Sequence, residues 1–149
     1  MLEAKDIMTR DVITVTEDAP VSEVAKIFLE KRINGVPVIN KEGAVVGVVC
    51  NSDLIDQTKK LHIPTVVALF DIVIYLESVK QFKKDLEKMA SSTVKNICSR
   101  DPITITPETS IEDIATIMAE KHVHTLPVVE GGKLVGIVGK MDIIRTMMP

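Results

Sequence analysis

Residues Asn34–Asp53 read NGVPVINKEGAVVGVVCNSD, and residues His124–Asp142 read HTLPVVEGGKLVGIVGKMD. Both stretches contain a proline within a short apolar run, a turn with glycine, a second apolar run and then an aspartate. Two short apolar runs joined by such a turn predict a β-hairpin, and the aspartate after them predicts the start of a helix. The chain therefore contains the same hairpin unit twice.

The repeat extends well before the hairpin. Asp11–Thr16 aligns with Asp101–Thr106, and Val21–Lys31 aligns with Ile111–Lys121, at an offset of 90 residues that falls to 89 after the hairpin turn. An alternating Ile-Thr-Val-Thr segment predicts a strand, and apolar residues at helical spacing predict an amphipathic helix. We therefore expect an α/β fold of two pseudo-symmetric β-α-β-β-α repeats that bury one shared face.

The pattern also predicts where the elements begin and end, because serine is a preferred N-cap residue and a closing aspartate marks a helix start. The expected elements of the first repeat are strand Val12–Thr16, a helix capped by Ser22, strands Val36–Ile39 and Val45–Cys50, and a helix from about Leu54 capped by Asn51–Asp53. Those of the second are strand Ile103–Thr106, helix Ile111–Lys121 behind Ser110, hairpin Leu126–Gly139, and closing helix Met141–Met147.

The composition limits the classes of function. Of the 149 residues, 46% are apolar and 3% are aromatic, there is no Trp, and the net charge is −3. Such a chain has few aromatic faces for stacking bases and no overall attraction to nucleic acid. Cys50 and Cys98 occupy non-equivalent places, and Met1–Arg10 carries charges where a signal peptide needs an apolar core. We expect a reduced, cytoplasmic protein that does not bind nucleic acid.

Residues 57–93 have no counterpart after the second repeat. They divide the chain into repeat 1 at residues 1–56, a helical insertion at 57–93, and repeat 2 at 94–149. From Ile72 to Met89, apolar positions recur every three or four residues among charged ones, which predicts a long amphipathic helix. Its apolar face needs a partner surface, so we expect a homodimer contact or closure over the rest of the protein.

The start of the insertion allows a second interpretation. Ile63–Leu76 is strongly apolar and lysines follow it, so an interfacial membrane segment is an alternative. The stretch contains Asp71 and is too short to span a bilayer, so we expect no transmembrane segment.

The strand V-I-T-V-T, the V-P-V-I hairpin and the segment G-V-V-C-N-S-D resemble a tandem CBS-domain pair, also called a Bateman module. The resemblance covers nearly the whole chain outside residues 57–93. It implies two repeats packed sheet to sheet, two clefts related by a pseudo-twofold axis, and dimerisation into a flat disc. Such clefts commonly hold AMP, ADP, ATP or S-adenosylmethionine as regulatory ligands. The module senses on behalf of a regulated partner protein, and no cofactor is required.

The ligand motif of this family is glycine, two apolar residues, Ser or Thr, two variable residues and aspartate. It corresponds here to Gly47–Asp53 and Gly136–Asp142. The resemblance assigns both aspartates to ribose hydroxyls, which a carboxylate can accept. Cys50 and Gly139 replace the hydroxyl residue of the motif, with Ser52 and Lys140 as candidates to compensate. The resemblance also assigns backbone groups of Val36, Pro37, Leu126 and Pro127 to the adenine edge, and Val12 and Pro102 to the wall against the ring.

Several of these features have a simpler interpretation. Asp53 and Asp142 also suit a helix-capping role, which is compatible with ligand contact. His122 and His124 lie two residues apart without a Cys or acid at metal-ligand spacing, so we expect no metal site. The sequence contains no catalytic motif, so we expect no enzyme. The alternative function is a ligand-free dimeric scaffold whose insertion helix recruits a protein or a membrane surface.

Overall fold

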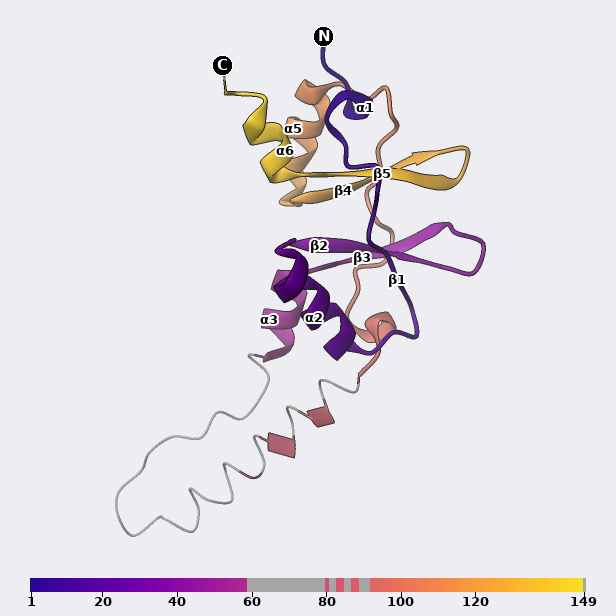
Figure 1. The fold of residues 1–149 in the computed structure, drawn as a ribbon, viewed down its shortest axis with the longest axis vertical. Helices are drawn as coiled ribbons and strands as arrows, with labels where there is room; N and C mark the ends of the chain where they lie inside the picture. The colour runs from indigo at the N-terminus through magenta and orange to yellow at the C-terminus, as the bar shows by residue number, and fades with distance from the viewer. Residues whose placement is uncertain (59–79, 81–82, 85–86, 89–91, 149) are drawn as a thin grey trace, which may run out of the picture.

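The computed structural model describes residues 1–58, 80, 83–84, 87–88 and 92–148. Two sheets lie one above the other at the centre, and helices cover the outer side of each sheet (Figure 1). The arrangement follows from the pattern of the repeat, because each sheet has an apolar face for its own helices and a second face for the other repeat.

The first repeat contains strand β1 (Val15–Thr16), helix α2 (Val21–Lys31), strands β2 (Gly35–Ile39) and β3 (Val45–Cys50), and helix α3 (Asn51–Thr58). β2 pairs in parallel with β1 and antiparallel with β3, with a register shift between Val38 and Ile39. These elements confirm the predicted β-α-β-β-α order in the first repeat.

The second repeat has the same plan. It contains helix α5 (Ile111–Lys121), strands β4 (Thr125–Glu130) and β5 (Lys133–Gly139), and helix α6 (Lys140–Arg145). β4 and β5 are antiparallel, and their register shift falls between Val128 and Val129, the positions equivalent to Val38 and Ile39. A single parallel bridge from Ile105 to Val128 takes the place of β1.

The first strand of each repeat is shorter than predicted. The strands expected over Val12–Thr16 and Ile103–Thr106 are limited to Val15–Thr16 and to the bridge at Ile105. The residues just before them leave the sheet edge and line cavities between the repeats. Alternation of side chains does not distinguish these two extended conformations, so the expected boundaries were too early.

Helix starts were predicted with mixed success. Ser110 is the N-cap of α5, and its hydroxyl accepts a hydrogen bond from the Asp113 N–H at 3.2 Å, as expected. α2 has Pro20 as its N-cap instead, so Ser22 lies inside the first turn. The N–H of Val21 already donates a hydrogen bond to the Ser92 carbonyl at 2.7 Å. One fewer unpaired N–H group therefore remains at this helix start for a serine side chain to accept.

The closing helices both begin earlier than predicted. α3 begins at Asn51 and α6 at Lys140, so each motif aspartate is the third residue of its helix instead of a cap ahead of it. α6 also ends at Arg145, two residues before the expected end at Met147. An acid in the first helical turn is favourable because the helix dipole is positive there.

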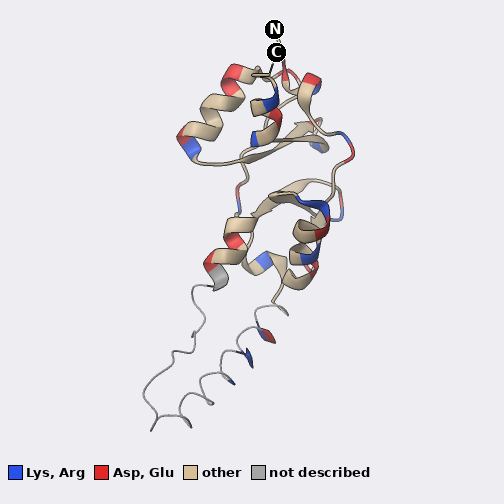
Figure 2. Cartoon of the chain, turned by 60° about the vertical axis from the view of Figure 1, so that its left-hand side comes forward, with Lys and Arg blue, Asp and Glu red and all other residues tan. Residues whose placement is uncertain are grey.

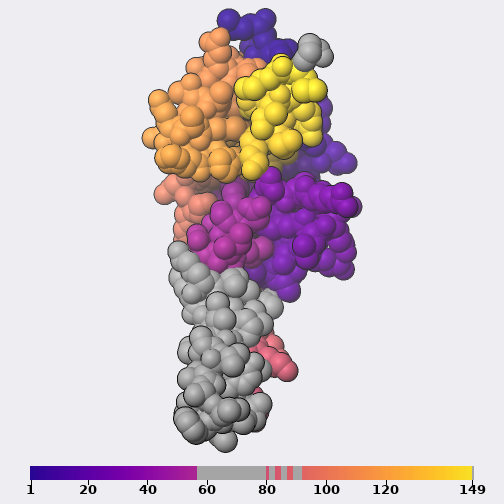
Figure 3. All heavy atoms as spheres, turned by 90° about the vertical axis from the view of Figure 1, so that its left-hand side faces the viewer, coloured from indigo at the N-terminus to yellow at the C-terminus, as the bar shows by residue number. Residues whose placement is uncertain are grey.

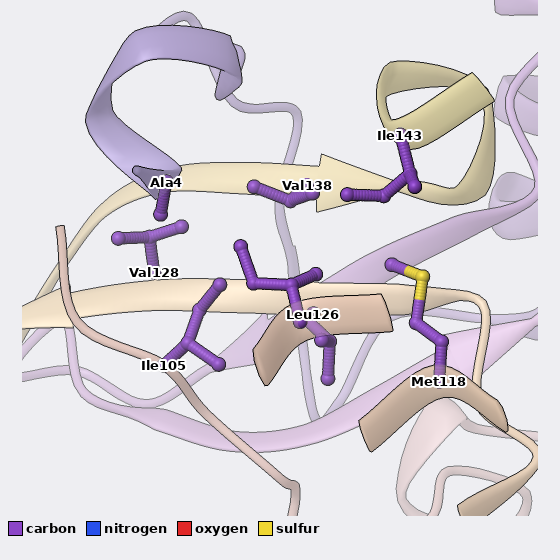
Figure 4. Close-up of a cluster of buried hydrophobic side chains, with 8 residues drawn as sticks. Ala4, Ile105, Met118, Leu126, Val128, Val138 and Ile143 are labelled. Carbon is purple, nitrogen blue, oxygen red and sulfur yellow. The ribbon is translucent and has the colours of Figure 1, made fainter. Parts of the chain in front are cut away.

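Each hydrophobic core takes a segment from outside its own repeat. Ala4, in helix α1 (Ala4–Ile7), is fully buried in the core of the second repeat (Figure 4), where it points toward Val128. Val94, in the 3-10 helix η2 (Val94–Asn96), is fully buried in the core of the first repeat. The segment that precedes each repeat therefore packs into the other one.

Two glycines make room for these crossing segments. A β-carbon on Gly47 would lie 2.7 Å from the Ser99 carbonyl oxygen, and one on Gly136 would lie 2.5 Å from Sδ of Met8. Both distances are shorter than real side chains tolerate, so the motif glycines have a structural reason that is independent of any ligand.

Most of the insertion lies outside the described residues, including the apolar positions of the predicted amphipathic helix and the stretch Ile63–Leu76. The described residues Lys80, Lys83, Lys84, Glu87 and Lys88 are helical and exposed, as expected for the polar face. Among all described residues, no helix is long and apolar enough to cross a membrane.

Charged side chains lie mainly on the helices and connecting segments, whereas the strands of the two central sheets are mostly uncharged (Figure 2). This distribution fits a sheet-to-sheet contact that is apolar at its centre.

Candidate functional site

Two groups of cavities lie where the repeats meet. The first, which we call the Asp53 cleft, consists of adjoining cavities of about 390 and 130 Å³ that share Thr125. The second, which we call the Asp142 cleft, consists of adjoining cavities of about 230 and 110 Å³ that share Gly35. Asp53 and Asp142 are equivalent in the repeat, as are Gly35 and Thr125, so the two clefts are related by the internal symmetry.

Each aspartate is fixed by the start of its own helix. Oδ2 of Asp53 accepts a hydrogen bond from the Cys50 N–H at 2.7 Å, and Oδ2 of Asp142 accepts one from the Gly139 N–H at 2.8 Å. Each carboxylate therefore stabilises the start of its helix from the third helical position, and not from the N-cap position that the simpler interpretation predicts. One oxygen serves the cap, and the other remains for a further contact, so capping and ligand binding are geometrically compatible.

The second carboxylate oxygen differs between the clefts. Oδ1 of Asp142 accepts a hydrogen bond from the Arg145 guanidinium at 2.8 Å. Asp53 has Asp56 at the position equivalent to Arg145, and its Oδ1 has no hydrogen-bond partner among the described residues. Burial raises the pKa of the Asp53 carboxyl, the charge of Asp56 raises it further, and the bond from the Cys50 N–H opposes both.

The hydroxyl position of the motif is filled by two unlike residues. Cys50 lines the Asp53 cleft, and burial, with a smaller effect of the Asp53 charge, raises the pKa of its thiol to about 11. The thiol is therefore neutral at pH 7 and offers a weak hydrogen bond. Gly139 lines the Asp142 cleft, and a β-carbon there would lie 3.8 Å from Asp142 Oδ2, which is ordinary contact.

The far wall of each cleft comes from the opposite repeat. Pro102, Ile103 and Val123 line the Asp53 cleft, opposite an aspartate of the first repeat. Their equivalents Val12, Ile13 and Ile33 line the Asp142 cleft, opposite an aspartate of the second repeat. Each cleft thus has a carboxylate from one repeat and an apolar wall from the other.

The remaining candidates lie at different distances from the clefts. Ser52 lines the Asp53 cleft, and Lys140 lines both clefts. Leu126 lines the Asp53 cleft, although its side chain is buried in the core. Val36, Pro37 and Pro127 are fully buried and line none of these cavities. The residues just before them, Gly35 and Thr125, occupy the cleft surface.

Sequence reasoning missed several lining residues. Asn34 and His124 are equivalent, and both line both clefts, so they form part of a shared wall. Arg32 lines the Asp142 cleft, and its equivalent His122 lines the Asp53 cleft. Arg32 and His122 both end their helices in the left-handed conformation, with φ of 53° and 54°. The two members of each pair lie the same number of residues before the hairpin of their own repeat. This equivalence in the sequence could have identified them.

The histidines do not form a metal site in the part of the chain that the structure describes, because no group of three His, Cys, Asp or Glu residues there could hold an ion.

Comparisons with known proteins identify the repeated unit. A family model described as the CBS domain matches residues 4–60 and again residues 94–149. The chain is 30% identical over 152 residues to the uncharacterized protein MJ1426 of Methanocaldococcus jannaschii, covering 97% of this chain and 90% of that protein. It is 28% identical to MJ1225 of the same organism, over 96% of this chain but 42% of that protein.

The fold is also similar to solved structures. CBSX2 from Arabidopsis thaliana, solved in complex with AMP, is 25% identical with a TM-score of 0.75, over 99% of this chain and 97% of that one. The structure of protein ATU1752 from Agrobacterium tumefaciens, at 20% identity, has a TM-score of 0.77 and covers 99% of this chain.

Proposed function

Because this chain belongs to the CBS-domain family, with two copies of the domain in tandem, we propose that it is a regulatory protein that binds an adenosyl ligand between its repeats. The ligand class is AMP, ADP, ATP or S-adenosylmethionine. The observation that carries the proposal is the composite cleft, in which a helix-anchored carboxylate faces an apolar wall from the other repeat. The AMP complex of CBSX2 supports the ligand class.

The cleft chemistry suits a nucleoside. Oδ1 of Asp53 can accept hydrogen bonds from a ribose diol while Oδ2 keeps its bond to the Cys50 N–H. The apolar side chains of Pro102, Ile103 and Val123 can cover the faces of an adenine ring. A ligand held in this way touches both repeats at once.

Regulation follows from this double contact. A ligand that bridges the two repeats favours the relative arrangement in which it makes more contacts, and this difference in affinity is what drives a conformational switch. The role proposed is therefore sensing on behalf of a regulated partner protein, with no catalytic step.

We also propose that the protein acts as a homodimer. α3 and α6 lie one above the other on the same face of the molecule (Figure 3), and they expose Ile55 (66% accessible) and Ile144 (48% accessible). Exposed apolar side chains on two adjacent helices are typical of an interface. The same observation favours the alternative function, a scaffold that associates without a ligand.

Isothermal titration calorimetry with AMP, ATP and S-adenosylmethionine tests the function directly. We expect binding by the wild type, and a loss of about 1.5–3 kcal/mol in the affected cleft for Asp53→Asn or Asp142→Asn, because a charge-assisted acceptor is removed. Asp18→Asn, an exposed acid that lines neither cleft, is the matched control. Absence of binding by all three compounds at millimolar concentration would leave the scaffold as the function.

A further inference from the structure

The two clefts are symmetric in backbone but not in charge. In three pairs of equivalent positions, one residue is a Lys or Arg that lines the Asp142 cleft and the other is not a Lys or Arg. The pairs are Arg32 and His122, Lys140 and Asn51, and Arg145 and Asp56.

The cations gather in the Asp142 cleft. Arg32, Lys140 and Arg145 all line its larger cavity, together with the single acid Asp142. Its smaller cavity adds one acid, Asp11, so the lining of the whole cleft has an excess of one positive charge.

The Asp53 cleft has the opposite balance. Its larger cavity has His122 and Asn51 at the positions of Arg32 and Lys140, and its smaller cavity adds the acid Asp101. Lys140 reaches this cleft as well and is the one Lys or Arg among the described lining residues. Counting the histidines as neutral, Asp53 and Asp101 therefore exceed the positive charge of the lining by one.

Arg145 is placed to serve a ligand as well as Asp142. Its guanidinium lies 2.8 Å from Asp142 Oδ1, and its side chain is 71% accessible whereas that of Asp142 is 15% accessible. A guanidinium has five N–H donors in a planar fork, so it can hold a carboxylate and a phosphate together. The equivalent position in the first repeat is Asp56, which has no N–H donor in its side chain to offer a phosphate.

We propose that the two clefts select different adenosyl ligands: the Asp142 cleft takes an adenosine with a 5′-phosphate, and the Asp53 cleft takes one whose 5′ substituent is neutral or cationic. The inference rests on the proposed function and adds to it, with Arg32 and Arg145 as the residues that determine specificity. The phosphate is neutralised by groups that belong to one cleft alone. The ribose and adenine contacts are shared by both ligands, because the carboxylate and the apolar wall are present in both clefts.

Two single-cleft variants test the assignment by calorimetry with AMP and with adenosine, which differ by the phosphate. Asp53→Asn leaves the Asp142 cleft intact, and Asp142→Asn leaves the Asp53 cleft intact. We expect the ratio of AMP affinity to adenosine affinity to be at least about tenfold higher in Asp53→Asn, since a charge-assisted bond to phosphate contributes that much.

The specificity residues are tested in the same backgrounds. Arg145→Leu together with Asp53→Asn is expected to weaken AMP about tenfold and to leave adenosine within about twofold. Asp56→Arg together with Asp142→Asn is expected to raise the affinity for AMP and not that for adenosine. Lys133→Ala, an exposed cation on β5 that lines neither cleft, is the control and is expected to change neither.

The outcomes separate this inference from the proposed function. Equal AMP to adenosine ratios in the two single-cleft variants would overturn the asymmetry and leave the function standing. A loss of adenosine affinity in Asp142→Asn that Asp53→Asn does not share would overturn it too. If the wild type bound neither compound at millimolar concentration, the proposed function itself would be wrong, and the asymmetry with it.

Discussion

Gly35 and Thr125 occupy the same position in the two repeats and face each other where β2 meets β4. A β-carbon on Gly35 would lie 2.7 Å from the Thr125 hydroxyl oxygen and 3.0 Å from its β-carbon. Thr125 is only 8% accessible, and because its β-carbon takes part in the contact, a rotation of its side chain would not relieve it. The glycine in one repeat therefore makes room for the threonine in the other, and this pair sets how closely the two sheets approach.

Gly35→Ala is expected to lower the free energy of unfolding by about 1–3 kcal/mol, because it overpacks a closed contact. Urea denaturation measures the change. Thr125→Ala removes the hydroxyl and methyl groups that the new β-carbon would meet. The double variant Gly35→Ala/Thr125→Ala is therefore expected to regain part of the free energy of unfolding that Gly35→Ala loses. Gly139→Ala is the control, because a β-carbon there meets nothing closer than 3.8 Å. Equal effects of the two glycine substitutions would show that backbone entropy, and not the contact, is responsible.

Gly139→Ser is expected to strengthen the binding of AMP by about tenfold, because it adds a hydroxyl donor for a charged phosphate. The site has room, and the φ of −107° at Gly139 is one that any residue adopts. Calorimetry with AMP and adenosine checks that the gain depends on the phosphate. Gly139→Ala supplies the same bulk without the donor, so an equal gain in that variant would contradict the explanation.

The Asp53 carboxyl makes stability depend on pH. Its pKa is raised by burial first and then by Asp56, so the folded protein holds this proton more tightly than the unfolded chain. This contribution to stability is therefore fully present below the ordinary carboxyl pKa of about 3.9 and is lost as pH rises through the raised value. Asp53→Asn does not titrate, so its stability relative to wild type is expected to increase with pH across that window.

Denaturation of the two proteins between pH 3 and pH 7, without ligand, measures this difference. Asp53→Ala removes the cap to the Cys50 N–H as well and is expected to be about 1 kcal/mol less stable than Asp53→Asn at every pH. A relative stability of Asp53→Asn that fell with rising pH would reverse the sign and disprove the argument.

The proposed homodimer depends on the face formed by α3 and α6. Ile55→Asp and Ile144→Asp each place a charge in an apolar interface, so we expect a dimer for the wild type and a monomer for the double variant at micromolar concentration. Light scattering measures the mass. Leu29→Asp replaces an exposed leucine on α2, outside this face, and is expected to leave the dimer intact. A monomeric wild type would show that this face is not an interface.

The insertion is expected to be dispensable for folding. Replacing residues 59–91 by a flexible linker keeps Ser92, whose carbonyl accepts a hydrogen bond from the Val21 N–H at 2.7 Å, and Val94, which is part of the first core. Circular dichroism and thermal unfolding check that both repeats remain. Replacement that also removes Val94 is the contrasting variant and is expected to unfold the first repeat.

The fold could be predicted from the sequence because each repeat contains short local patterns that identify its strands, turns and helices. Apolar runs, turn glycines and an aspartate at fixed spacing describe each hairpin and the helix after it, and both appear where expected. The limits of the first strands could not be predicted, since the alternation of side chains at Ile13 and Ile103 does not show whether these residues pair in a sheet or line a cleft. The crossing of α1 into the second core could not be predicted either, because Ala4 has no distinctive neighbours in sequence.

The candidate site could also be predicted only in part from the sequence. The motif drew attention to Asp53 and Asp142, which both lie in clefts. It did not indicate that each cleft takes its apolar wall from the other repeat, because that depends on how the sheets pack. The expected backbone contribution of Val36 and Pro37 to the adenine edge stays a prediction, because their side chains are buried, whereas Gly35, one residue before Val36, lines the Asp142 cleft. A shift of one residue in a strand moves a side chain to the opposite face.

The crossing of segments between the cores bears on how the chain folds as it leaves the ribosome. The first core remains incomplete until Val94 emerges, long after β3 has been made. Ala4 is synthesised before the strands of either repeat, yet its binding site includes Val138 and Ile143 of the second repeat. The first repeat can therefore complete its core once the segment around Val94 has been made, before the second repeat is synthesised, but helix α1 cannot pack at that stage. Helix α1 must wait, unpacked, until β5 and α6 of the second repeat have been made.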